Sequence, residues 1–302
     1  MNTRTITISF YGLGVLVLAG LILFAPKTSS DIDVVSEVSV ETNDVPEESL
    51  TETTLTADAP VSQEIEEEHK RAVVAAAYTL SGESVTGWKS EKRWPIASIT
   101  KLMSALVIRR HFDPDEEIRI STNSTGIYGT AGEFSENEVF KLEDLIKAMM
   151  LVSSNDAAYA LGEHYGYRKL IGEMNEMAVV IGMKNTKFAD PTGLSVENQS
   201  TADDIAKLVR YIYENDRGLL DLTTHPTEII TNLNTGLSRQ LVSINNFAGR
   251  PDFLGGKTGR LPEADGNLVS VFKVPGYEEP IIIVVLGSQD RFKETEEILI
   301  NL

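Results

Sequence analysis

The chain lacks cysteine altogether, which excludes disulfides, cysteine nucleophiles and metal sites built on thiolates. Histidine is scarce as well: none of the four histidines stands in a His-Glu-x-x-His pattern, and the chain has no Gly-x-Ser-x-Gly elbow. The usual signatures of zinc peptidases and α/β-hydrolases are therefore missing. Basic residues are also few, because 27 lysines and arginines face 45 acidic residues for a formal net charge of −18. Such a charge disfavours a nucleic-acid partner.

The acidity is concentrated in one stretch near the amino terminus. Thirteen acidic residues and no lysine or arginine lie between Asp31 and Glu68. Residues 27–68 also show no persistent helical or strand period, so they bury too little apolar surface to offset the entropy of ordering. We expect an acidic disordered linker over residues 27–68 and a folded catalytic domain over residues 69–302.

An apolar run precedes the linker. It extends from Ile6 to Ala25, close to the ~20 residues that an α-helix needs to cross a bilayer. A cleaved signal peptide is the alternative, but no small-x-small cleavage site precedes Pro26. We expect an uncleaved signal-anchor over residues 6–26. Arg4 favours a cytoplasmic start over residues 1–5, which puts the rest of the chain outside a cell membrane that it crosses once.

Strand and helix patterns alternate in a definite order after the linker. Strands are expected over residues 73–80, 84–89, 254–258, 267–273 and 281–286, and helices around 102–110 and 142–150 and over 156–164, 167–181, 202–213 and 291–302. Strands at both ends with helices between them predict an α+β fold, in which an antiparallel sheet is interrupted by an all-helical insertion.

Three short motifs point to a serine nucleophile activated by lysine. They are Ser98-Ile99-Thr100-Lys101, Ser153-Ser154-Asn155 and Lys257-Thr258-Gly259. Residues three apart share a helix face, so the Lys101 amine can reach the Ser98 hydroxyl. Lysine removes the serine proton only when it is neutral, which requires burial or a nearby positive charge. The structural alternatives are a helix-capping serine and a solvated helix lysine.

The chain resembles penicillin-recognising serine enzymes, most closely the D-alanyl-D-alanine carboxypeptidases among low-molecular-mass penicillin-binding proteins. The likeness covers roughly residues 70–302 and is carried by five stretches: Pro95 to Met103, Ser153 to Ala158, Asp190 to Leu194, Gly255 to Gly259 and Asn267 to Val269. This family implies a β-lactamase/transpeptidase-like fold, with a five-stranded antiparallel sheet flanked by helices and an active site between the sheet and the helical part.

The resemblance also implies roles for the second motif. Ser153 would relay a proton between Lys101 and the leaving group, while Asn155 would orient Lys101 and hydrogen-bond the substrate amide. Capping of a helix–helix junction is the structural alternative for Ser153 and Asn155.

For the third motif, the family implies a strand edge that accepts an extended peptide. Lys257 and Thr258 would hold the substrate carboxylate. Gly259 leads to Arg260, whose backbone N–H would form an oxyanion hole with that of Ser98. Arg291 is a weaker candidate for attracting the carboxylate, and we favour a solvated position at a helix start for it.

The expected function is a membrane-tethered serine-type D-Ala-D-Ala carboxypeptidase. It would trim peptidoglycan stem peptides through an acyl-enzyme on Ser98, take β-lactams as covalent inhibitors, and need no metal or organic cofactor. A class A-like β-lactamase and a non-catalytic domain that senses β-lactams or cell wall remain alternatives. No Glu-x-x-Leu-Asn segment lies between Asn155 and Lys257, and this absence favours the carboxypeptidase.

Overall fold

A computed structural model describes residues 72–129 and 131–302. The predicted cytoplasmic start, the signal-anchor over residues 6–26 and the linker over residues 27–68 lie outside the described residues. Within the part of the chain that is described, no helix has the length and apolar character needed to cross a membrane.

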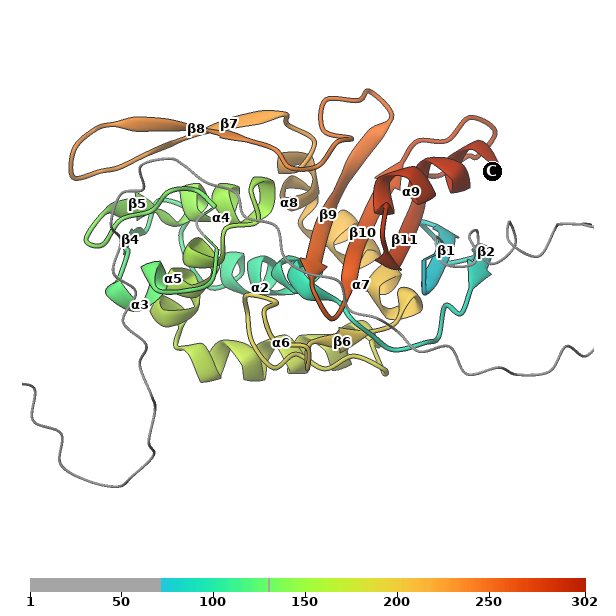
Figure 1. The fold of residues 1–302 in the computed structure, drawn as a ribbon, viewed down its shortest axis with the longest axis horizontal. Helices are drawn as coiled ribbons and strands as arrows, with labels where there is room; N and C mark the ends of the chain where they lie inside the picture. Colours follow the sequence, from blue (N-terminus) through green and yellow to red (C-terminus); the bar gives the residue numbers. More distant parts are fainter. Residues whose placement is uncertain (1–71, 130) are drawn as a thin grey trace, which may run out of the picture. The chain divides into compact units, whose positions relative to one another are not determined.

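A five-stranded antiparallel sheet joins the two ends of the described chain (Figure 1). Its strand order is β2-β1-β11-β10-β9. The strands are β1 (Val74–Thr79), β2 (Ser84–Trp88), β9 (Phe253–Leu261), β10 (Asp265–Phe272) and β11 (Ile281–Ser288). The long apolar run of β11 is buried throughout, which its central place between β1 and β10 explains. The sheet confirms the predicted fold class.

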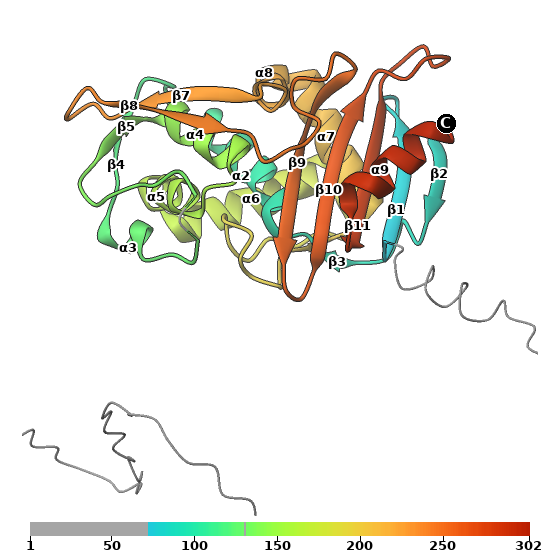
Figure 2. The ribbon, with the colours of Figure 1, turned by 45° about the horizontal axis from the view of Figure 1, so that its top comes forward.

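Helices cover both faces of this sheet. Helix α9 (Arg291–Ile300) packs on β10 and β11, and α7 (Ala202–Asn215) packs on β1 and β11 from the other side (Figure 2). Alternate residues of β10 divide between the two cores, because Leu268 belongs to the cluster under α9 and Val269 to the larger cluster on the helical side. The period of two thus gives the sheet two buried faces.

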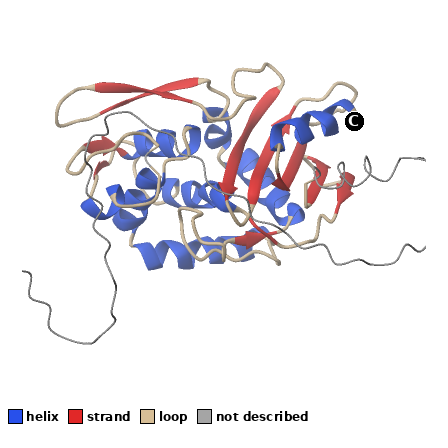
Figure 3. Ribbon diagram, viewed as in Figure 1, coloured by secondary structure: helices blue, strands red, loops and turns tan. Residues whose placement is uncertain are grey.

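The helical part lies beside the sheet (Figure 3). It is built around one buried helix. Helix α2 (Thr100–Arg109) is buried at every position except its last. It follows the short 3₁₀ helix η1 (Ala97–Ile99), and α4, α5 and α6 pack around it. Their bounds are α4 (Leu142–Leu151), α5 (Asn155–Tyr165) and α6 (Tyr167–Ile181).

Several short elements were not among the predicted ones. They are β3 (Trp94–Pro95), β4 (Glu117–Arg119), α3 (Thr122–Thr125), β5 (Val139–Lys141), β6 (Gln199–Ser200), α8 (Arg217–Leu222), β7 (Thr227–Thr231) and β8 (Ser238–Val242). Strands β7 and β8 form a separate two-stranded ribbon that packs on α4. Most of the others span two to six residues, too few for a hydrophobic period to appear.

Candidate active site

Ser98 lies in a strained turn before α2 and does not act as a helix cap. The preceding residue, Ala97, has a φ of 50°, a left-handed conformation that is unfavourable for a residue with a Cβ atom. Neither η1 nor α2 has a side-chain capping bond at its amino end. The cap interpretation of this serine therefore has no support in the structure, and the hydroxyl remains available for other contacts.

Two glycines allow neighbouring segments to approach Ser98 closely. A Cβ atom on Gly193 would lie 2.2 Å from the Ala97 carbonyl oxygen, and one on Gly259 would lie 3.2 Å from the Ser98 nitrogen. Gly193 also has a φ of 85°. Only glycine fits at position 193, because a side chain would collide with the turn that carries Ser98.

Lys101 is fully buried one helical turn after Ser98. Its Nζ atom donates to the Ser98 Oγ at 3.1 Å, to the Asn155 Oδ1 at 2.7 Å and to the Thr192 carbonyl oxygen at 2.5 Å. All three acceptors are neutral. Burial lowers the pKa of Lys101 to about 7, against a smaller opposing effect of the Asp190 charge. A substantial fraction of this amine is therefore neutral near physiological pH.

The loop that carries Thr192 is organised by Asp190. One carboxylate oxygen accepts hydrogen bonds from the Thr192 N–H, the Thr192 hydroxyl and the Gly193 N–H at 2.5–2.8 Å, and the other accepts from Ser195 and Asn198. This network holds the Thr192 carbonyl against the Lys101 amine. The predicted site assigned no role to Asp190, although its stretch was among those that carry the resemblance.

The second motif divides capping and site functions among its three residues. Ser154 caps α5, since its hydroxyl accepts from the Ala157 N–H at 3.2 Å. Ser153 has a φ of 59° and accepts from the Lys257 Nζ at 2.9 Å. Asn155 contacts Lys101 as described. The capping alternative thus applies to the middle residue, and the two flanking side chains face the lysines.

Lys257 reaches the same cluster from the sheet. It is 1% exposed, and its Nζ also donates to the Thr258 carbonyl oxygen at 2.8 Å. Burial, followed by the nearby charges of Lys101 and Arg291, lowers the pKa of Lys257 well below its ordinary value. The hydrogen-bond partners of its amine are neutral oxygen atoms.

Strand β9 is the last strand of the sheet, and its outer edge carries polar backbone groups. The Gly256 N–H points away from β10, because it donates to the Thr223 hydroxyl at 2.9 Å. Backbone groups alternate sides along an antiparallel strand, and the pairing with β10 is regular from Gly256 to Leu261. The N–H groups of Thr258 and Arg260 therefore point off the same free edge.

These groups line a cleft of about 570 Å³ between the sheet and the helical part. Its polar lining includes Ser98, Ser153, Asn155, Thr258 and Arg260. Its apolar lining consists of side chains from four segments, namely Tyr128, Leu194, Ile244, Leu261 and Pro262. The predicted site residues are thus brought together in one place, with the two lysines buried beneath the cleft.

Comparison with known proteins agrees with the family resemblance found in the sequence. The sequence profile of the D-alanyl-D-alanine carboxypeptidase family matches residues 58–290. This chain belongs to that family. It is 40% identical over 119 residues to a D-alanyl-D-alanine endopeptidase of Escherichia coli, covering 38% of each chain. It is 33% identical over 191 residues to one of Haemophilus influenzae, covering 61% of this chain and 64% of the relative. The chain thus spans less than two thirds of the length of these curated relatives.

A solved structure with a similar fold is a penicillin-binding protein of Listeria monocytogenes in its ampicillin-bound form. It shares 28% sequence identity and a TM-score of 0.66 with this member of the carboxypeptidase family, covering 75% of this chain and 95% of its own. The shared fold includes the sheet and the helical part that enclose the cleft.

The expectation for Arg291 is confirmed in its position at a helix start and wrong in its solvation. It is half-buried and lines the cleft, and its Nη1 donates to the Gly259 carbonyl oxygen at 2.9 Å. Arg291 is the first residue of α9, and Asp290 caps the helix by accepting from the Lys293 N–H at 3.1 Å. No periodicity indicated that this side chain folds back over β9.

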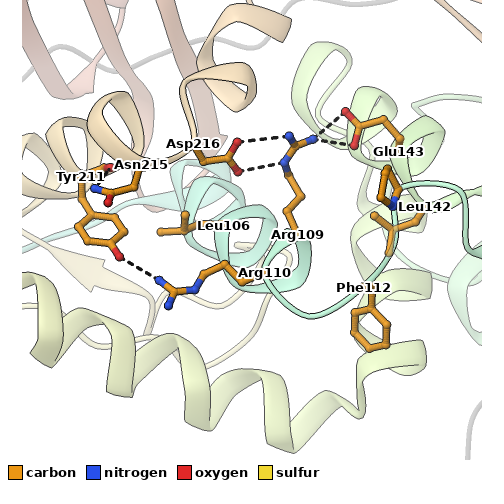
Figure 4. Close-up of a pocket in the computed structure, with 10 residues that line it drawn as sticks. Leu106, Arg109, Arg110, Phe112, Leu142, Glu143, Tyr211, Asn215 and Asp216 are labelled. Carbon is orange, nitrogen blue, oxygen red and sulfur yellow. Dashed lines mark hydrogen bonds and ion pairs between the residues drawn. The ribbon is translucent and has the colours of Figure 1, made fainter.

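A second cavity, of about 400 Å³, lies at the opposite end of α2 (Figure 4). Its central cation, Arg109, contacts Glu143 at 2.6 Å and Asp216 at 3.0 Å. Both carboxylates point at the guanidinium, and Arg110 contacts the Tyr211 hydroxyl at 2.9 Å. Arg109 is thus paired with two carboxylates, whereas Lys101 at the other end of α2 has only neutral partners. Within the described residues, no group of three metal-ligating acidic or histidine side chains is present.

Proposed function

We propose that this chain is a serine-type D-Ala-D-Ala carboxypeptidase that trims peptidoglycan stem peptides. The observation that carries the proposal is the buried Lys101 amine, 3.1 Å from the Ser98 hydroxyl and with its pKa lowered to about 7. A neutral amine at this distance is a competent general base for a serine nucleophile.

Acylation would begin with transfer of the Ser98 proton to the Lys101 Nζ. The Ser98 oxygen would then form a bond to the carbonyl carbon of the penultimate D-alanine. The resulting oxyanion would accept hydrogen bonds from the backbone N–H groups of Ser98 and Arg260, of which the second points off the free edge of β9. Preorganised donors of this kind stabilise the charge that develops in the transition state.

Collapse of the tetrahedral intermediate would break the bond between the carbonyl carbon and the departing nitrogen. That nitrogen needs a proton, and Ser153 is suited to deliver it because its hydroxyl lines the same cleft as Ser98 and is held by the Lys257 amine at 2.9 Å. Lys101 would replenish the proton that Ser153 gives up, while Asn155 keeps the Lys101 amine in place through its 2.7 Å contact. Water would then release the acyl group and restore Ser98.

The arrangement of cations supports recognition of a carboxylate. Lys257 is buried with neutral partners, and Arg291 lies near enough to lower its pKa. A substrate carboxylate entering beside Thr258 would supply the missing counter-charge and favour the protonated form of Lys257. A terminal D-alanine and a β-lactam both carry such a carboxylate.

The lining of the cleft also bears on the β-lactamase alternative. No aspartate or glutamate is among the described side chains that line it. A β-lactamase of the alternative class relies on such a group to activate the deacylating water. We therefore expect a penicillin adduct on Ser98 to persist, with covalent inhibition as the result.

An endopeptidase that cuts D-alanine cross-links is the second candidate. It is favoured by the two curated relatives described above, both named as endopeptidases. The chemistry at Ser98 would be identical, and only the departing amine would differ. Release of free D-alanine from a pentapeptide, compared with cleavage of a cross-linked peptide dimer, separates the two activities.

We also propose that residues 6–26 anchor the protein in the cell membrane with its catalytic domain outside. The proposal is supported by the length of the apolar run and by the acidic composition of residues 27–68. Fractionation of cells should recover the protein at full mass with membranes. A soluble form that begins near Pro26 would instead indicate a cleaved signal peptide.

The central experiment incubates the full-length protein with labelled penicillin and maps the modified residue by mass spectrometry. Acylation should occur at Ser98, disappear in Ser98→Ala, and persist in Ser135→Ala, which removes an exposed serine from a loop. A D-Ala-D-Ala peptide should also release D-alanine repeatedly. Labelling of another serine would overturn the proposed nucleophile, and rapid penicillin turnover without D-alanine release would favour the β-lactamase.

A further inference from the structure

Two arginines, Arg260 and Arg291, lie side by side at the edge of the cleft, and neither side chain takes part in the acylation steps above. Arg260 is exposed on β9, two residues after Thr258. Side chains two apart on a strand share one face, about 7 Å from each other along the strand. Arg260 therefore projects on the same side as Thr258, where the carboxylate of the departing residue is expected.

Arg291 reaches this place from α9 through a gap in the sheet surface. Gly266 pairs with Arg260 across β9 and β10. A Cβ atom on Gly266 would lie 3.4 Å from the Arg291 Cδ and 3.5 Å from its Nη1. The missing side chain thus leaves the space that the Arg291 guanidinium occupies next to Arg260.

The two arginines are not equivalent. Arg291 is tied to the Gly259 carbonyl oxygen, and its Nε atom is buried without a hydrogen-bond partner among the described residues. Burial, followed by the charge of Arg260, lowers the pKa of Arg291, although Asp290 opposes this effect. The exposed guanidinium of Arg260 makes no ion pair or side-chain hydrogen bond within the described chain. Arg260 can therefore turn towards a ligand, whereas Arg291 is fixed.

The charged side chains that line the cleft are cationic. No acidic side chain is among the described residues lining the cleft, although the chain as a whole has a formal net charge of −18. Two adjacent guanidinium groups repel each other unless an anion lies between or beside them. Arginine forks also match the geometry of a carboxylate better than a lysine does.

We propose that Arg260 binds a second carboxylate on the departing half of the substrate. The preferred leaving group would carry one carboxylate at its reacting carbon, held near Thr258, and another farther along its side chain, held by Arg260 and supported by Arg291. An amino diacid or diamino diacid has this chemistry, whereas terminal D-alanine offers only the first carboxylate. This inference rests on the acyl-enzyme chemistry at Ser98 in the proposed function, and because the preferred leaving group is not D-alanine, it favours the endopeptidase candidate over the carboxypeptidase.

The test uses the full-length protein and three peptides that share one acetylated half ending in D-alanine. Their departing residues are D-alanine, D-glutamate and D-glutamine. The last two are nearly identical in size and differ in the second carboxylate. The wild-type protein should cleave the D-glutamate peptide with a kcat/KM about tenfold above that of the D-glutamine peptide, as expected for a charge-assisted contact. Added salt should reduce this ratio.

Substitutions test whether Arg260 causes the preference for the D-glutamate peptide. Arg260→Gln should bring the ratio of the two kcat/KM values to within about twofold of one, and Arg260→Lys should retain part of the preference because the charge remains. Arg168→Gln is the matched control, since it removes an exposed arginine on α6 outside the cleft. It should keep the wild-type ratio. A ratio near one in the wild type, or an unchanged ratio in Arg260→Gln, would overturn the assignment.

A competition assay separates this inference from the proposed function. The dipeptides D-alanyl-D-glutamate and D-alanyl-D-glutamine compete with labelled penicillin for Ser98, and the rate of acylation is measured. Stronger protection by the D-glutamate dipeptide in the wild type, lost in Arg260→Gln, supports the second carboxylate site even if no peptide is hydrolysed. Hydrolysis at equal rates with equal protection would leave the proposed function standing and refute the role of Arg260.

Discussion

The two ends of helix α2 hold cations in opposite environments. Near its amino end, Lys101 is fully buried against neutral oxygen atoms, and burial lowers its pKa to about 7. At its carboxyl end, Arg109 is also partly buried, but hydrogen bonds to Asp216 and the charge of Glu143 outweigh burial and raise its pKa. Helix α2 thus carries one lysine that can lose its proton and one arginine that stays protonated.

This difference separates a reactive site from a structural one. A buried ion pair with several hydrogen bonds holds elements together but has no remaining capacity to bind or to transfer a proton. A buried amine without a counter-ion reduces stability and gains reactivity. Removing each cation should therefore have opposite consequences for stability and for chemistry.

The largest effect is expected for Lys101→Met. Loss of the base should slow acylation of Ser98 by penicillin at least ~10³-fold. The variant should not lose stability at pH 7, because a lysine whose pKa is lowered in the folded state destabilises that state, and this cost disappears only as the pH rises towards the unfolded pKa. Calorimetry tests the prediction about stability, and acylation kinetics on the same preparation test the prediction about the base. A Lys101→Met protein that acylates within tenfold of wild type would show that another group is the base.

Arg109→Met should produce the reverse result. It leaves the carboxylates of Glu143 and Asp216 without their shared partner, and should lower the free energy of unfolding by about 2 kcal/mol, given that these side chains keep some contact with solvent. The acylation rate of the folded protein should stay within about twofold. Urea denaturation measures the loss. If stability were unchanged and acylation failed, the far end of α2 would belong to the catalytic machinery.

The pH dependence of acylation should follow the lowered pKa of Lys101. The neutral amine is the active form, so the rate should fall about tenfold per pH unit below pH 7 and level off above it. The carboxylate of penicillin stays ionised throughout this range, so the profile reports on the protein. Circular dichroism at each pH provides the folding control. A rate that rises only above pH 9 would mean that Lys101 keeps an ordinary pKa.

The smallest effect on acylation is expected for Ser121, a serine in the same Ser-x-Asn pattern as Ser153 that has only a structural role. Ser121 also begins a Ser-x-Asn sequence, but its hydroxyl caps α3 by accepting from the Ser124 N–H at 3.0 Å. Ser121→Ala should cost ~1 kcal/mol of stability and leave acylation within about twofold. Ser153→Ala should slow acylation much more. Equal rates for the two variants would remove Ser153 from the proton path.

The sequence was sufficient to predict the main sheet and the central helices, because their apolar patterns are long. The apolar stretches of β1 and β11 are both buried, β1 at all positions but its second and β11 throughout. The β7–β8 ribbon was missed although both strands contain β-branched residues around a loop ending in Gly236. That signal is typical of a hairpin, and it was outweighed by the many polar residues of the ribbon.

The sequence predicted which residues form the site more completely than it predicted how the chain holds them in place. Motif spacing indicated Ser98 and Lys101, but not the loop that Asp190 builds to bring a carbonyl to the lysine. Hydrogen bonds of this kind depend on how a chain turns back on itself, which no local period records. The positive φ at Ala97 and Ser153 is likewise unpredictable, since neither residue type favours that conformation.

The claim at the centre of this account is that Lys101 is largely neutral at the pH where Ser98 reacts. NMR titration of the full-length protein with isotope-labelled lysine side chains measures this directly, and the Lys101→Met spectrum assigns the signal. A titration midpoint of about 7 is expected for Lys101. A midpoint for Lys101 of about 10.4, the ordinary value for a lysine side chain, would contradict the mechanism.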